Sequence, residues 1–185
     1  RATALARETG KDPRVIELLL QESREILRAQ REVIIAEHRT GLILANAGID
    51  RSNLGSGEEA VLLLPEDPDA SAARIRAALG VEFGSTPGVI VTDSIGRPWR
   101  LGTVGLAIGS AGVPAVKDLR GVGDRYGREL QVSETAPADS LAAAAVLVMG
   151  EAAESTPAVL IRGYRETSTQ RAADVLRPRD LDLFR

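Results

Sequence analysis

The first third of the chain places apolar residues at helical spacing. Asp12 and Pro13 predict a helix start, because a carboxylate caps free N–H groups and proline suits the first helical position. Apolar side chains then recur at helical spacing, at Val15, Ile16, Leu19, Leu20, Ile26 and Leu27. We therefore expect one helix that extends to about Gln30.

Further along the chain, short apolar runs separated by glycine and proline predict a mixture of strands and helices. Strands are expected at 33–36, 42–45, 60–64, 88–92, 129–133 and 158–162, with 60–64 and 88–92 buried. Helices are expected from Asp67 or Asp69 to Gly80, over 138–149 and over 168–176. The stretch 102–123 is glycine-rich with short apolar pieces. Because the elements follow no strict βαβ rhythm, we predict an α+β (mixed α/β) fold in a single domain, 1–185.

Composition narrows the classes of function. The net charge of -3 and the aromatic content of 3% argue against a nucleic-acid binder, which needs a basic surface or stacking platforms. The chain has no cysteine, so a bound metal would need oxygen ligands or the single histidine, His38. No apolar run reaches the roughly 18 residues of a membrane span, and the first residues lack a signal-peptide layout. We expect a cytoplasmic protein with no membrane partner.

The first candidate segment is ANAGIDRSNLGSGEE, residues 45–59. Asp50 follows an apolar strand there, and Ser52 and Asn53 add short polar groups beside it. The glycines of the segment allow the backbone to approach a ligand closely, at Gly48, Gly55 and Gly57.

The second candidate segment is VIVTDSIGRPWR, where Asp93 and Ser94 stand at the expected end of a buried strand. A carboxylate beside a hydroxyl suits a magnesium–phosphate pair. Two carboxylates from separate strand ends would hold a metal that bridges phosphate oxygens. Arg97 and Arg100 would then supply positive charge for a phosphate or a carboxylate. The alternative from pattern alone is that Asp93 and Ser94 form only a turn or a helix cap.

Two other side chains have a simpler interpretation. His38 is the only histidine, which leaves no basis for a Ser-His-Asp triad, and we interpret it as structural. Trp99 is interpreted as a packing residue.

Six stretches together resemble one family. They are ETGKDPRVIELLLQES, EHRTGLILANAGIDRSN, LLLPEDPDASAARIR, VIVTDSIGRPWRLG, GVGDRYGRELQVSE and AAVLVMGEAAESTPAVLIRG, and they cover nearly the whole chain. In content and order they resemble the coenzyme F420 gamma-glutamyl ligases, including the ligase domain of the bifunctional actinobacterial form. AGIDRSN and VTDSIGRPWR are the most specific of these motifs.

The resemblance implies a GTP-dependent ligase that adds L-glutamate to the deazaflavin precursor of coenzyme F420 through an acyl phosphate. It implies two Mg²⁺ or Mn²⁺ ions, a K⁺ ion as a further cofactor, and an intertwined homodimer. By match to the family's motifs, the metal residues are Asp50, Asp93, Ser94 and Gly150. The implied nucleotide contacts are Asn53 and the segment Leu147, Val148, Met149, Gly150, Glu151, Ala152, Ala153 and Glu154. Which atom there reaches a metal stays open between the Glu151 side chain and the Gly150 carbonyl.

The same resemblance implies that a preceding strand and loop of the type VVTSK, which would add a serine and a lysine to the nucleotide site, are missing here. On that interpretation the fragment itself would bind GTP poorly or be inactive, even if the parent protein is a ligase. Two alternatives stay open beside the ligase. One is a non-catalytic dimerisation or precursor-binding module of the same fold, and the other is a related ligase for another small carboxylate.

Overall fold

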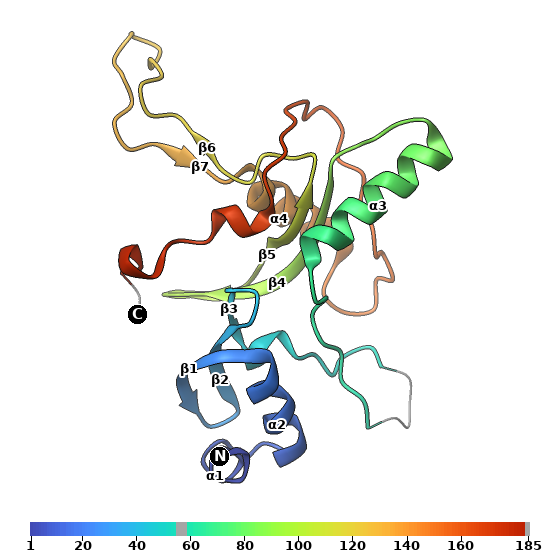
Figure 1. The fold of residues 1–185 in the computed structure, drawn as a ribbon, viewed down its shortest axis with the longest axis vertical. Helices are drawn as coiled ribbons and strands as arrows, with labels where there is room; N and C mark the ends of the chain where they lie inside the picture. Colours follow the sequence, from blue (N-terminus) through green and yellow to red (C-terminus); the bar gives the residue numbers. More distant parts are fainter. Residues whose placement is uncertain (55–58, 184–185) are drawn as a thin grey trace. The chain divides into compact units, whose positions relative to one another are not determined.

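The computed structural model describes residues 1–54 and 59–183 (Figure 1). The chain divides into two compact units. Unit 1 comprises Arg1–Glu66, Ile95–Thr103 and Leu176–Arg185, and unit 2 comprises Asp67–Ser94 and Val104–Val175. Helices and antiparallel sheets occur together, so the predicted α+β class is confirmed. The prediction of a single domain stays a prediction.

Unit 1 begins with two helices that pack on a three-stranded antiparallel sheet. Its elements are α1 (Ala2–Thr9), α2 (Pro13–Glu22), β1 (Ser23–Gln30), β2 (Val33–His38), β3 (Ile43–Ala45) and the short helices η1 (Asn46–Gly48) and η3 (Arg179–Leu181). Asp12 caps α2 as predicted, since its carboxylate accepts from the Arg14 N–H at 2.8 Å. Ile16, Leu19 and Ile34 are fully buried between the helices and the sheet, so this interface is the core of the unit.

The predicted extension of α2 to Gln30 is wrong. The helix ends at Glu22, where the Ser23 hydroxyl donates to the Leu19 carbonyl at 2.6 Å, and the next eight residues form β1. β1 pairs with β2 along its length, with two irregularities in register. The apolar pair at 26 and 27 fits a helix or a strand locally, and the long-range ladder to β2 decides between them.

The predicted strands at 33–36 and 42–45 are confirmed as β2 and β3, and a turn joins them in which the Gly41 N–H donates to the His38 carbonyl. The buried strand predicted at 60–64 is wrong. Only Leu62 pairs there, in a single bridge to Asp50, and half of Leu62 is exposed at 51%. Leu62 and Leu63 are exposed, whereas the other residues of the run, Ala60, Val61 and Leu64, are half-buried.

Unit 2 is built on a long hairpin flanked by two helices (Figure 1). Its elements are α3 (Pro68–Phe83), β4 (Val89–Arg97), β5 (Arg100–Ala111), β6 (Lys117–Asp118), β7 (Glu134–Thr135), α4 (Pro137–Met149) and the short helix η2 (Ala172–Val175), and the tip of the hairpin belongs to unit 1. The predicted helices at Asp67 and at 138–149 are confirmed, although α3 continues past Gly80 to a left-handed cap at Gly84.

Glycines allow both helices to approach β5 closely. A Cβ at Gly105 would lie 2.6 Å from the Ala142 carbonyl oxygen of α4, and a Cβ at Gly109 would lie 2.2 Å from the Pro68 carbonyl oxygen of α3. These contacts require residues without a side chain. The first part of the glycine-rich stretch, 102–111, belongs to one continuous strand, where the sequence predicted only short pieces.

Four further strand and helix predictions are wrong in whole or in part. β4 continues to Arg97, so Asp93 lies inside the strand and not at its end, and the strand is half-buried. In 129–133 only Glu129 makes a bridge, and 158–162 forms no strand. The predicted helix at 168–176 is reduced to η2. The Leu130 N–H donates to the Val122 carbonyl and the Leu130 carbonyl accepts from the Gly121 N–H, yet no regular ladder forms there, so apolar content alone does not fix a strand. No helix among the described residues is long and apolar enough to cross a membrane.

Candidate functional site

Asp50 is held by its own loop in unit 1. Its backbone pairs with Leu62, and its carboxylate accepts from the Ser52 N–H at 2.8 Å and from the Ser52 hydroxyl at 2.6 Å. The hydroxyl bond from Ser52 is the main reason why the pKa of Asp50 is lowered. The residue is exposed. The loop therefore presents an ionised, oriented carboxylate to solvent, which is what a cation ligand requires.

Asn53 and the following residues continue this loop. Asn53 is exposed and takes the left-handed conformation at φ 53, which asparagine tolerates better than most residues. Gly55 and Gly57, predicted to allow close backbone approach, lie outside the described residues. On the far side of that gap, Glu59 accepts from the Arg14 guanidinium of α2 at 2.5 Å. The loop is thus tied to the start of α2.

Asp93 and Ser94 lie together on β4 in unit 2, both half-buried. The Ser94 N–H donates to the Asp93 carboxylate at 2.8 Å. The neighbouring Thr92 hydroxyl donates to the Leu106 carbonyl at 3.0 Å, which adds a side-chain hydrogen bond between β4 and β5. The predicted alternative of a turn or helix cap is wrong, because this is regular strand. Asp50 belongs to unit 1, and Asp93 belongs to unit 2.

The two predicted arginines lie at the tip of the β4–β5 hairpin. Arg97 is half-buried and donates to the Gly102 carbonyl at 3.0 Å, while Arg100 is exposed. Trp99 and Leu101 beside them are 84% and 99% exposed. Trp99 also has φ 58 in the turn. The interpretation of Trp99 as a packing residue is wrong within this chain, since the side chain has no covering layer.

The segment 147–154 forms the end of α4 and the loop after it. Gly150 caps the helix at φ 77 and ψ 177, a conformation essentially restricted to glycine. The Glu154 side chain folds back onto it, because a Cβ on Gly150 would lie 2.5 Å from a carboxylate oxygen of Glu154. That carboxylate accepts from the Ala152 N–H at 2.8 Å, and this bond is the main cause of its lowered pKa. Leu147 and Val148 are exposed.

The chemistry of these side chains fits a divalent cation. Carboxylate and hydroxyl oxygens are the ligands that Mg²⁺ and Mn²⁺ prefer, and Asp50, Asp93 and Ser94 offer them. Within either unit, the described residues include no group of three or more acidic or histidine side chains that could hold a metal by itself. Neither Asp50 in unit 1 nor the Asp93–Ser94 pair in unit 2 is part of such a group.

Comparisons with known proteins identify the family. The family model described as F420-0:Gamma-glutamyl ligase matches residues 1–163. The chain is 48% identical over 189 residues to the Coenzyme F420:L-glutamate ligase of Methanopyrus kandleri, and covers 74% of it. It is 44% identical over 185 residues to the protein of the same name in Methanocaldococcus jannaschii, and covers 73% of that one. Both alignments span 100% of the chain. The chain belongs to the F420-0:gamma-glutamyl ligase family.

The resemblance seen in the sequence motifs is thus confirmed. A third member of the ligase family, from Methanothermobacter thermautotrophicus, is 47% identical over 187 residues, again across 100% of the chain. Every predicted site residue, from Asp50 to Glu154, lies within the part that the ligase family model matches. Their individual roles stay predictions.

Sequence reasoning missed two anchoring residues of this ligase-family chain. Arg14 binds Glu59 from 45 positions away. Asp69 was read only as a possible helix cap, yet its carboxylate accepts from the backbone of Ser110 and of Ala172. Both contacts join residues far apart in sequence, and no local pattern signals them.

The interpretation of His38 as structural agrees with its surroundings in unit 1. The ring is fully buried, its Nδ1 accepts from the Thr40 N–H at 3.1 Å, and its Nε2 faces the Glu22 carboxylate at 3.2 Å. Because Nδ1 accepts, the proton resides on Nε2 and is donated to Glu22. Burial is the main reason why the pKa of His38 is lowered, against the opposing effect of Glu22. The histidine is a packed, neutral side chain and not a free general base.

Proposed function

We propose that the protein is a GTP- and divalent-metal-dependent ligase that joins L-glutamate to the deazaflavin precursor of coenzyme F420. The observation that supports this most directly is the similarity over the whole chain to relatives named Coenzyme F420:L-glutamate ligase. The match of the family model over residues 1–163 supports it independently. Formation of an amide from a carboxylate and an amine requires activation of the carboxylate, which GTP supplies.

The reaction proceeds in two steps, phosphorylation of the carboxylate and then attack by the amine. A carboxylate oxygen of the precursor attacks the γ-phosphorus of GTP, the bond to the β–γ bridging oxygen breaks, and GDP leaves. The glutamate amine then attacks the carbon of the acyl phosphate, inorganic phosphate leaves, and the nitrogen loses a proton. Phosphoryl transfer of this kind depends on positioning and charge neutralisation more than on a protein nucleophile. The important protein groups for this reaction are therefore side chains that orient phosphates and cations.

In this proposal Asp50, Asp93 and Ser94 hold the divalent cations, with Gly150 beside them. The cations would neutralise charge on the phosphate oxygens. The Ser52 hydroxyl keeps Asp50 ionised and oriented, which supports the role of that carboxylate. Asn53 and the segment 147–154 contact the nucleotide. The fixed turn at Gly150 supports this, because its conformation presents backbone groups without a side chain in the way.

Arg97 and Arg100 are proposed to contact the anionic substrates from the tip of the hairpin. Arg97 donates one guanidinium N–H to the Gly102 carbonyl. This bond orients the side chain and leaves its other N–H groups for a ligand. Arg100 is exposed. A homodimer is part of the proposal, as is K⁺ as an additional ion. The exposed Trp99 and Leu101 support an interface with a second copy, since large apolar side chains gathered at one turn mark a contact surface.

The test is a ligation assay with the full-length protein. GTP, Mn²⁺, L-glutamate and the precursor should give GDP, phosphate and a product heavier by one glutamyl residue in mass spectrometry. Asp50→Asn and Asp93→Asn should each reduce kcat/KM by roughly a hundredfold or more, since each removes a charge at the phosphoryl group. Asp180→Asn, an exposed aspartate in η3, is the matched control and should leave the rate unchanged. A folded protein that forms no product, or an Asp50→Asn variant as active as the control, would overturn the proposal.

A further inference from the structure

Unit 2 contains an open cavity of about 730 Å³ that none of the proposed roles uses. Three segments line it. They are the first half of α3, the end of β5 with Gly112, and the coil 167–171. The volume falls within the roughly 300–1,000 Å³ typical of sites for small organic molecules, and is far larger than an inorganic ion needs.

Hydrogen bonds join the segments that line the cavity. The Asp69 carboxylate of α3 accepts from the Ser110 N–H at 2.7 Å and from the Ala172 N–H at 2.7 Å, which joins all three segments. The Gln170 side-chain oxygen accepts from Ala115 N–H at 2.9 Å and holds the coil to the chain after β5. The cavity is therefore a built feature of unit 2 and not a gap between loose coils.

Arg76 lines this cavity with an unused hydrogen-bond donor. Its Nε is buried and has no hydrogen-bond partner among the described residues. The guanidinium makes one hydrogen bond there, from Nη2 to the Thr86 carbonyl at 3.3 Å. Gly112 packs directly against it, since a Cβ at that position would lie 2.5 Å from Nε. A buried N–H donor without a partner is unfavourable, and an anionic ligand at this half-buried guanidinium would offset its positive charge.

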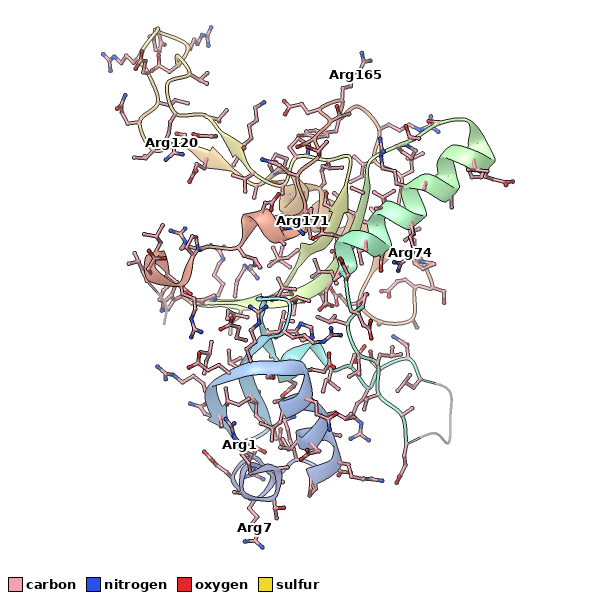
Figure 2. The ribbon with its side chains drawn as sticks, in the orientation of Figure 1. Arg1, Arg7, Arg74, Arg120, Arg165 and Arg171 are labelled. Atoms are coloured by element: carbon pink, nitrogen blue, oxygen red, sulfur yellow. The ribbon has the colours of Figure 1, made fainter. Side chains whose placement is uncertain are left out.

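The other charged residues of the lining do not cancel this positive charge. Asp67 accepts from the Ala70 N–H at 2.8 Å as the cap of α3, and Asp69 is occupied by the backbone donors described above. Arg171, labelled on the C-terminal coil in Figure 2, adds a second guanidinium whose closest acid, Asp174, lies 3.9 Å away. Both acids are thus satisfied within the protein, whereas both arginines keep donors available.

The rest of the lining combines hydroxyl groups with small apolar side chains. Ser110, Thr167, Ser168 and Thr169 supply the hydroxyls, and Ala70, Ala73 and Ala111 supply the apolar wall. Hydroxyls beside arginines suit the oxygen atoms of an anion, and a wall of alanines leaves room for an organic body. We propose that this cavity binds an organic anion, a phosphate ester or a carboxylate, through the guanidinium groups of Arg76 and Arg171.

The test uses three probes with the same aromatic body on the full-length protein, namely phenyl phosphate, benzoate and the neutral benzamide. Titration calorimetry should show binding of at least one anion and none of benzamide. Arg76→Gln should weaken that binding roughly tenfold or more, because it removes a charge-assisted contact. Arg74→Gln is the matched control on the same helix, since Arg74 donates to the Ser71 hydroxyl and is not among the residues that line the cavity (Figure 2).

A second variant separates loss of anion binding from unfolding of the Arg76→Gln protein. Ala73→Leu keeps both arginines and places a larger side chain into the lining, so it should also weaken anion binding while circular dichroism shows an intact fold. Tighter binding of phenyl phosphate than of benzoate assigns a phosphate ester, and the reverse assigns a carboxylate. Lack of binding by both anions, equal binding of benzamide, or an affinity unchanged in both Arg76→Gln and Ala73→Leu would overturn the proposal. None of these outcomes bears on the ligation assay, which depends on Asp50 and Asp93.

Discussion

Asp69 offers a sharp test of how unit 2 is held together. Its carboxylate accepts from the N–H groups of Ser110 and Ala172, both at 2.7 Å, and from that of Ala173 at 3.4 Å. Ser110 and Ala172 are each only 3% exposed, so water cannot readily replace the lost acceptor. Replacing Asp69 by alanine would therefore leave two buried N–H groups unsatisfied at once.

The expected magnitude follows from those two groups. A buried donor left unpaired costs about 1–3 kcal/mol, so Asp69→Ala should lower the free energy of unfolding by about 2–6 kcal/mol. The weak third bond to Ala173 adds little at its length. The substitution is in the first turn of α3, where losing an acidic side chain removes a further stabilisation of about 0.3–1 kcal/mol.

Urea denaturation followed by far-ultraviolet circular dichroism measures this change. Glu82→Ala is the control, because Glu82 is an exposed acid near the other end of α3 and should change the free energy of unfolding by less than about 0.5 kcal/mol. A change no larger for Asp69→Ala than for Glu82→Ala would refute the idea that this carboxylate joins the three segments.

Three further outcomes are expected. Gly150→Ala should lower the free energy of unfolding by about 1–3 kcal/mol in the same urea assay, because Gly150 has φ 77 and ψ 177. The control Gly96→Ala should change it far less, because a Cβ at Gly96 would have no atom within 4 Å apart from those of Gly96 and its two chain neighbours. The single imidazole should titrate below its ordinary pKa of 6.5 in a proton NMR titration, since burial lowers the pKa of His38, and a midpoint above that value would contradict the buried neutral ring. Because the unfolded chain takes up this proton first, stability should fall as pH drops below about 6.5 and level off below the folded pKa, with no such fall above pH 7. Asp67→Ala should destabilise the protein by about 1 kcal/mol through loss of the α3 cap, and an unchanged urea midpoint would argue against that cap.

The sequence by itself determined the features that depend on neighbouring residues. Helix starts at Asp12 and Asp67 were predictable because a capping carboxylate and a following proline act within one turn. The α4 helix and its glycine end were predictable because an alanine-rich run favours a helix and a glycine ends it. The family motifs around Asp50 and Asp93 also stand in the sequence, and they pointed to the ligase family before any coordinates.

Tertiary structure decided the features that depend on distant partners. Ser23–Gln30 is a strand because β2 pairs with it, although its apolar residues also continue a helical pattern. The glycines of β5 are read locally as breaks, yet they exist because α3 and α4 pack against that strand. The hydrogen bond from the Ala172 N–H to Asp69, and the Arg76 Nε that has no partner among the described residues, are visible only in the folded chain. Local propensity acts over a few residues, whereas ladders, close packing and cavities depend on segments that the sequence places far apart.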